Sequence, residues 1–294
     1  MLTLLVKGAF HWGFSVRIVT ESAGAQYYPY PPPSTLIGAL AYGLSALKGL
    51  PECRLSASSG GRAALLSNAA STYGIVRWAA FAFSDELSVV QRSAAVGYSD
   101  FIRAFRLPYQ RGARHTWEQR DMWYGVSAHG KVYACGAGFK AFYLIDEGRL
   151  KDLGVNDSDL LTAAYSIVRI GVRESLVSVT AVEASRDIRA SMAEEVKRPF
   201  ETEYYFPARL AEDVEEAETT HLPKLDVKLW EFRPESPIAL HDHEGYYMPS
   251  RLAFILTPGR MRINKLAKGG ALLTARFNDN RVERLVVPID VVRP

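Results

Sequence analysis

The sequence predicts an α+β fold, and three observations support this prediction. Apolar segments with strand character recur along the whole chain, only two segments carry a strong helical pattern, and strands separate those two helices. The chain has 294 residues, of which 48% are hydrophobic, so it can bury a sizeable core as one large domain or two smaller ones. This composition excludes an intrinsically disordered protein.

The first elements are strands at residues 2–10 and 14–19, followed by a helix that begins at a run of prolines. Prolines hold the approach extended, leucines recur at helical spacing from residue 36, and Gly49 marks the end. We expect Ser34 or Thr35 to cap this helix, whose apolar faces favour burial against a sheet. Because no acidic residue lies nearby, the same helix N-terminus at Ser34 and Thr35 is also a candidate anion site.

The elements that follow have the order of a known structural unit. They are expected as a strand, an insertion, a strand, a helix and a strand at about residues 73–84, 90–130, 131–145, 157–171 and 176–184. Asp157 or Ser158 is expected to cap the second helix, and Gly171 to end it. The resulting order, βαββαβ, predicts a ferredoxin-like (RRM-like) domain over residues 1–190, with the insertion projecting from two paired strands.

The composition changes near residue 191. A charged and aromatic stretch at 191–220 is expected to be a connector, and residues 221–294 are expected to form a β-rich C-terminal region.

Charge and motifs exclude several classes of protein. The 35 basic residues nearly balance the 32 acidic ones, so the net charge of +3 is not diagnostic. The chain has no phosphate-binding loop, dinucleotide fingerprint or nucleophile elbow, which argues against a standard nucleotide hydrolase or acyl transferase.

Cys53 and Cys135 lie far apart and are expected to be free thiols. We see no signal peptide or membrane span, and therefore expect a cytoplasmic protein.

The segment from Ser99 to Gly125 is the strongest candidate for a binding site. Its aromatic residues alternate with six basic residues: Arg103, Arg106, Arg111, Arg114, His115 and Arg120. Cations for the backbone and rings for the bases are the combination that single-stranded nucleic acids require. The alternative is a hairpin whose rings pack against the domain and whose arginines are only solvated.

Two further clusters of side chains are candidates for binding a ligand. Arg169 and Arg173 flank Gly171 in the turn after the second helix, where the glycine could cap the helix or the turn, with Ser175, could hold a phosphate. His241 and His243 could share one face of a strand, but a third ligand is missing. We therefore expect no metal and no cofactor.

Three segments together resemble a known family: FHWGFSVR at 10–17, YPYPPPSTLIGALAYGL at 28–44 and RIGVRESLVSV at 169–179. The chain resembles CRISPR-associated protein family five of the RAMP superfamily, most closely its archaeal type I-A branch. The resemblance covers the N-terminal two-thirds, and the C-terminal third matches only in its strand-rich character.

The resemblance implies a non-catalytic subunit of a type I interference complex (Cascade). Such a subunit binds the 5′ handle of the CRISPR RNA and contacts the large subunit and the first backbone subunit. It also implies a β-hairpin thumb at the position of the arginine segment, where splayed bases of single-stranded RNA could be bound.

A second possibility comes from the type I-C branch, which cleaves precursor RNA without a metal. That branch uses a helix tyrosine and a lysine-histidine pair, for which the nearest counterparts are Tyr42 and the pair Arg114 and His115. Arginine does not readily lose a proton, although His115 could act as an acid or base. The metal-independent endoribonuclease is therefore the alternative hypothesis.

Overall fold

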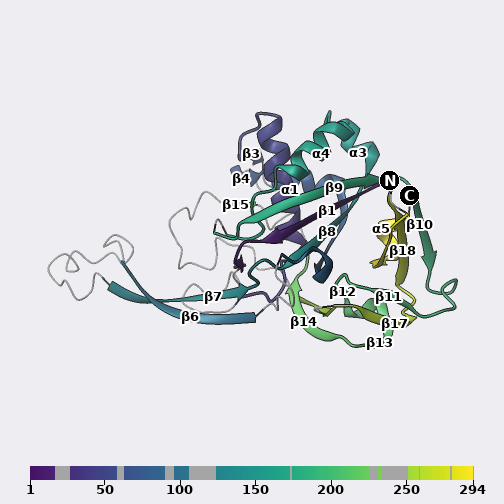
Figure 1. Cartoon of the computed structure of the whole chain (residues 1–294). Coiled ribbons are helices and arrows are strands. Elements are labelled where there is room, and N and C mark those ends of the chain that lie inside the picture. Colours follow the sequence, from purple (N-terminus) through teal and green to yellow (C-terminus); the bar gives the residue numbers. More distant parts are fainter. Residues whose placement is uncertain are drawn as a thin grey trace.

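A four-stranded antiparallel sheet forms the centre of the molecule, in the strand order β5-β8-β1-β9 (Figure 1). The computed structural model describes residues 1–16, 27–57, 63–89, 96–105, 124–172, 174–225, 231–232, 251–257, 259–278 and 280–293. The four strands are β5 (Val76–Ser84), β8 (Gly138–Ile145), β1 (Leu2–Phe10) and β9 (Val177–Ser185). β1 pairs with β8 and β9, and β5 pairs with β8.

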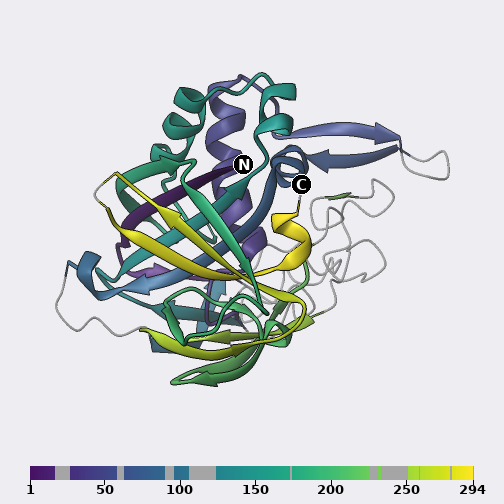
Figure 2. The ribbon, with the colours of Figure 1, turned by 90° about the vertical axis from the view of Figure 1, so that its right-hand side faces the viewer.

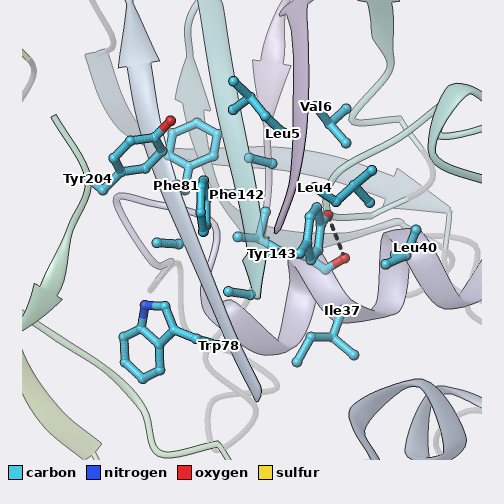
Figure 3. Close-up of a cluster of buried hydrophobic side chains, with 14 of the residues drawn as sticks. Leu4, Leu5, Val6, Ile37, Leu40, Trp78, Phe81, Phe142, Tyr143 and Tyr204 are labelled. Carbon is cyan, nitrogen blue, oxygen red and sulfur yellow. Dashed lines mark hydrogen bonds between the residues drawn. The ribbon is translucent and has the colours of Figure 1, made fainter. Parts of the chain in front are cut away.

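Both faces of this sheet are covered at its two central strands, β1 and β8, which explains why these strands are largely apolar. Every residue of β1 and β8 is buried. Neighbouring residues of β8 point to opposite faces: the hydroxyl of Tyr143 donates to the carbonyl of Leu36 in helix α1 at 3.0 Å, while the ring of Phe142 lies 5.8 Å from that of Tyr204 (Figure 3). Helices therefore cover one face, and the C-terminal half of the chain covers the other.

Helix α1 (Pro33–Leu47) begins two residues earlier than a cap at Ser34 would allow, and three residues earlier than a cap at Thr35 would allow. Pro32 is its N-cap, and no side chain caps it; the amide of Thr35 donates to the carbonyl of Pro32 at 2.9 Å. The capping prediction is wrong because proline is well suited to the first helical position, where its missing N–H costs nothing. The expected burial of the helix is confirmed for Leu36, Leu40 and Leu44.

Helix α4 (Asp157–Tyr165) packs beside α1 and is shorter than predicted. Asn156 caps it rather than Asp157 or Ser158, and the side chain of Asp159 completes a capping box. A Cβ at Gly43 of α1 would lie 2.3 Å from the carbonyl oxygen of Ala163 in α4. The two helices can therefore approach this closely only because residue 43 lacks a side chain.

Three small sheets of the C-terminal half cover the second face of the central sheet. Their strand orders are β10-β18-β19, β11-β17-β13 and β12-β16-β14. The strands are β10 (Ile188–Met192), β11 (Phe200–Thr202), β12 (Phe206–Pro207), β13 (Ala211–Glu215), β14 (Glu218–Pro223), β16 (Arg251–Leu256), β17 (Met261–Leu266), β18 (Gly270–Arg276) and β19 (Val282–Pro288). A short helix, α5 (Ile289–Val292), follows β19.

Buried ion pairs join the two halves of the molecule. We call the following six residues the buried ion network: Lys7, Lys140, Glu183, Glu203, Arg281 and Glu283. The ammonium group of Lys140 in β8 lies 2.9 Å from Glu203 and 3.3 Å from Glu283 of β19. Burial raises the pKa of Glu283. Burial lowers the pKa of Lys140, but the carboxylates of Glu283 and Glu203 outweigh that effect and raise it.

Two ribbons project from the body. β6 (Val96–Phe105) and β7 (Tyr124–Tyr133) form a long antiparallel pair that leaves the molecule between β5 and β8 in chain order (Figure 1). β2 (Gly13–Phe14) pairs with the base of β7. β3 (Cys53–Ala57) and β4 (Ala63–Ser67) form the second ribbon, which β15 (Glu231–Phe232) joins at β4 (Figure 2).

Residues 56–71 do not form the plain connection that their composition suggested. They contain parts of β3 and α2 (Ala69–Ile75) and all of β4. Helix α3 (Glu147–Asp152) also follows β8 without having been predicted. Within 191–220, strands β11, β12 and β13 pair with β16 and β17, while the proposed three-part division of the chain stays a prediction. Cys53 and Cys135 are exposed free thiols, as expected.

Candidate nucleic-acid interface

A groove of about 610 Å³ runs along the exposed side of α1. Thr35, Gly38, Tyr42 and Ser45 line it at spacings of three and four residues, so one stripe of the helix forms its wall. The other walls come from residues 15–16, the start of α2 and the turn that joins α4 to β9. Small residues on α1 leave room for a ligand to approach the helix closely.

Arg169 and Tyr42 form the most distinctive contact in this groove. The guanidinium carbon of Arg169 lies 5.2 Å from the centre of the Tyr42 ring, within the range of a cation–π interaction. The ring is 47% exposed, and within the described ranges no carboxylate forms an ion pair with Arg169. The pair therefore presents a charge that can bind phosphate next to a flat apolar surface on which a base can stack.

The turn that carries Arg169 is held in one shape by Ser15. The amide of Val172 donates to the carbonyl of Ser15 at 3.0 Å, and the amide of Ser15 donates to the hydroxyl of Ser175 at 3.0 Å. Gly171 has a φ of 119°, and a Cβ there would lie 2.8 Å from the Ser15 carbonyl oxygen. A residue other than glycine would therefore strain this turn.

These contacts change two of the sequence predictions. Gly171 does not cap α4, because that helix already ends at Tyr165. Ser175 is fully buried and bound to Ser15, so its hydroxyl supports the turn from within and does not face a phosphate.

Ser15 also connects the turn to the base of the β6–β7 ribbon. Its hydroxyl donates to the carbonyl of Gly130 in β7 at 2.8 Å. Close by, the indole of Trp12 donates to the carbonyl of Glu174 at 2.5 Å, and the ammonium of Lys131 lies 5.6 Å from the Trp12 ring. The groove and the ribbon base thus share a fixed framework that also bears a half-buried cation and the ring of Trp12.

The structure brings together some of the predicted site residues. Thr35, Tyr42 and Arg169 all line the groove, whereas Ser34 is half-buried beside it. Arg103 belongs to β6, although only its backbone is described. Six further candidates lie outside the described residues: Arg106, Arg111, Arg114, His115, Arg120 and Arg173.

The structure adds residues that the sequence did not single out. Ser15 was hidden within an expected strand, and Asn68 and Ala69 were within the segment expected to be a connection. Glu52 also lines the groove and places a carboxylate there. Only the FHWGFSVR resemblance pointed near any of these positions.

His241 and His243 also lie outside the described residues. Within the described part of the chain, no group of three or more potential ligands could hold a metal ion. None of the described helices is long and apolar enough to cross a bilayer.

Comparison with known proteins identifies the family. A protein of Saccharolobus solfataricus named CRISPR-associated protein Cas5 2 is 28% identical over 269 residues, which cover 90% of this chain and 88% of that protein. The CRISPR system aCascade subunit Cas5 1 of the same organism is 32% identical over 200 residues, which cover 67% of this chain and 68% of that protein. The chain belongs to the Cas5 family of CRISPR-associated proteins. No family model matches it.

A solved structure also resembles this Cas5 protein. The crystal structure of a CRISPR protein from Archaeoglobus fulgidus matches with a TM-score of 0.50, covering 98% of this chain and 100% of that one. At 17% sequence identity, the match concerns the fold alone. The predicted combination of sheets with few helices is therefore confirmed, as is the predicted family.

Proposed function

We propose that this Cas5 protein is a non-catalytic subunit of a Cascade complex and that its α1 groove holds the 5′ handle of the CRISPR RNA. The observation that carries the proposal is the placement of the Arg169 guanidinium over the exposed ring of Tyr42 at the groove wall. The name of the aCascade subunit relative supports membership of such a complex. The large subunit and the first backbone subunit are the expected protein partners, in the cytoplasm.

The chemistry of the groove suits single-stranded RNA. A guanidinium can donate two parallel hydrogen bonds to a phosphate, and an exposed ring can stack on any base. Hydroxyl groups of Thr35, Ser45 and Ser67 could bind phosphate oxygens or the 2′-hydroxyl groups that distinguish RNA from DNA. Glu52 would oppose a phosphate at its end of the groove, so the backbone should enter at the Arg169 end.

We further propose that the central sheet and helices α1 and α4 are the ferredoxin-like unit predicted from the sequence. The strand order β5-β8-β1-β9 and the positions of the two helices between strands support this assignment. The β6–β7 ribbon would then be the thumb. Its two strands flank residues 106–123, the part of the chain that carries most of the predicted RNA-binding arginines.

The test is a titration of handle RNA against the purified protein and two variants. Arg169→Gln should weaken binding about tenfold or more and reduce the salt slope by about 0.7 per lost phosphate contact. Arg262→Gln is the matched control, because Arg262 is an exposed arginine on β17 that does not line the groove. Equal affinities of the two variants would refute the assignment of the groove.

The thumb and the catalytic alternative need separate tests. Replacing Arg106, Arg111 and Arg114 with alanine should also weaken handle binding if the thumb contacts RNA. Incubation with repeat RNA in EDTA should leave the RNA intact. A discrete product that disappears in Tyr42→Phe or His115→Ala would instead establish the metal-independent endoribonuclease.

A further inference from the structure

A second cavity, of about 340 Å³, lies where the start of β5 and helix α3 meet the C-terminal strands. None of the residues that line the α1 groove lines this cavity. Its volume falls at the lower end of the range for small-molecule sites, roughly 300–1,000 Å³. It is therefore a separate site of a size that suits a small ligand.

The inner wall of the cavity is apolar and contains one polar atom without a partner. Trp78, Leu252 and Phe254 contribute to this wall, and Trp78 is only 8% exposed. The indole Nε1 of Trp78 is buried and has no hydrogen-bond partner within the described residues. The wall beside the cavity is therefore suited to a flat, largely apolar ligand surface.

The cavity is lined by more cations than anions. Arg77, Arg149, Arg209 and Lys224 contribute to its lining, against the single carboxylate of Asp290. Arg77 and Arg149 are partly neutralised, because both lie within 4.0 Å of one carboxylate, that of Asp146.

Arg209 and Lys224 differ from the other two cations. Across the described ranges, neither side chain forms an ion pair or a hydrogen bond. Among the described residues, the lining therefore offers two positive charges that no carboxylate pairs with, beside an apolar wall.

We propose that this cavity binds a nucleoside monophosphate, with the phosphate held by Arg209 and Lys224 and the base against the wall at Trp78. A doubly charged phosphate matches the two cations, which form no ion pair within the described part of the chain, and arginine is well suited to it. The flat faces of a base match the apolar wall that Trp78, Leu252 and Phe254 form. Inorganic phosphate would leave the wall unused, and an apolar ligand would leave the cations unused.

The binding experiment compares adenosine monophosphate and uridine monophosphate with adenosine and with inorganic phosphate, by calorimetry at low salt. Each nucleotide should bind one site per chain, and the nucleoside and phosphate should each bind about tenfold more weakly or worse. Absence of nucleotide binding at millimolar concentration, or equal binding of the nucleoside, would overturn the proposal.

Variants then locate the site. Arg209→Met and Lys224→Met should each reduce nucleotide affinity about tenfold, and neither breaks a contact within the described residues. Lys268→Met, an exposed lysine that does not line the cavity, is the control. Trp78→Phe should weaken nucleotide binding because it reduces the apolar wall, and melting measures how much stability the removal of buried ring atoms costs. Equal affinities of all these variants would refute the site.

Two further arms separate this site from the groove and identify the source of the nucleotide. Arg169→Gln should leave nucleotide affinity unchanged, and a loss there would place the nucleotide in the groove and overturn the proposal. Competition by a 5′- or 3′-phosphorylated oligoribonucleotide, but not by a hydroxyl-ended one, would identify the occupant as a strand end. No competition by either would identify a free nucleotide. The proposal does not depend on RNA binding in the groove, so the two can fail independently.

Discussion

Replacing Lys140 with methionine removes the positive charge between the half-buried Glu203 and the buried Glu283, and we expect it to destabilise the protein by about 1–3 kcal/mol at neutral pH. The side chains of Lys140 and Glu283 are only 7% and 6% exposed, so water cannot replace the lost ammonium group. Methionine has a similar length and keeps the packing of the stem. The loss therefore reports the missing ammonium group between the two carboxylates, which keep only Arg281 and Arg260 as cationic partners, and not a cavity.

The pH dependence of this loss is the sharper part of the prediction. Burial already raises the pKa of Glu283 above its unfolded value, and loss of the lysine should raise it further. A carboxyl group whose pKa is higher in the folded state than in the unfolded state destabilises the protein when it ionises. The resulting loss of folding free energy is largest at a pH above the folded-state pKa, and it vanishes at a pH below the unfolded-state pKa. The deficit of Lys140→Met should therefore shrink as the pH falls from 7 towards 4.

Urea denaturation followed by circular dichroism, at several pH values between 4 and 7, measures this deficit. The double variant Lys140→Met, Glu283→Gln should regain part of the loss at pH 7, because it removes a buried charge that has lost one of its two cationic partners. If the deficit is the same at every pH and is not reduced in the double variant, the reasoning about the buried ion network is wrong.

Four other substitutions test backbone conformation, helix packing and helix capping. Gly171→Ala should lower the free energy of unfolding by about 1–3 kcal/mol, because φ is 119° and the new Cβ would meet the Ser15 carbonyl. The same substitution should weaken handle binding. Thermal melting measures the first effect, and RNA titration measures the second. Gly43→Ala should destabilise α1 by about 1–3 kcal/mol. Gly38→Ala, with no atom within 4 Å, should stabilise the same helix by up to about 1 kcal/mol, so melting shifts of the same sign would contradict this account. Asn156→Ala should cost about 1 kcal/mol in chemical denaturation through loss of the capping box, and unchanged stability would contradict that role.

The sequence predicted those elements whose patterns are local. The expected strand at 2–10 coincides with β1, because a continuous apolar run with buried neighbours on both faces needs no further context. The helix after the prolines was also predicted, but its start was placed too late. The sequence contains two alternative start signals, a serine or threonine that could cap the helix and a proline that could occupy its first position. An error of this kind shifts the predicted helix start by less than one turn and leaves the rest of the helix correctly placed.

The site could be predicted only in part, because it depends on contacts between distant segments. Tyr42 and Arg169 were each noticed for reasons of their own, but nothing in the sequence indicates that one lies over the other. Lys7 and Lys140 interrupt two apolar strands, and their carboxylate partners lie in β9 and the C-terminal half. Tertiary packing alone determines such pairs.

The groove and the β6–β7 ribbon should respond together to RNA, because Ser15 is bound to both. Its amide and carbonyl hold the turn that carries Arg169, and its hydroxyl holds β7 at Gly130. The side chain of Ser15 is buried, so these bonds are protected from competition by water. A strand of RNA that contacts the ribbon would therefore meet the Arg169 and Tyr42 surface at a fixed distance, without an ordering step between the two. Such pre-organisation lowers the entropic cost of binding a flexible single strand. It also suggests why the FHWGFSVR segment resembles the family: this segment contains Ser15, which joins the two parts of the proposed RNA interface.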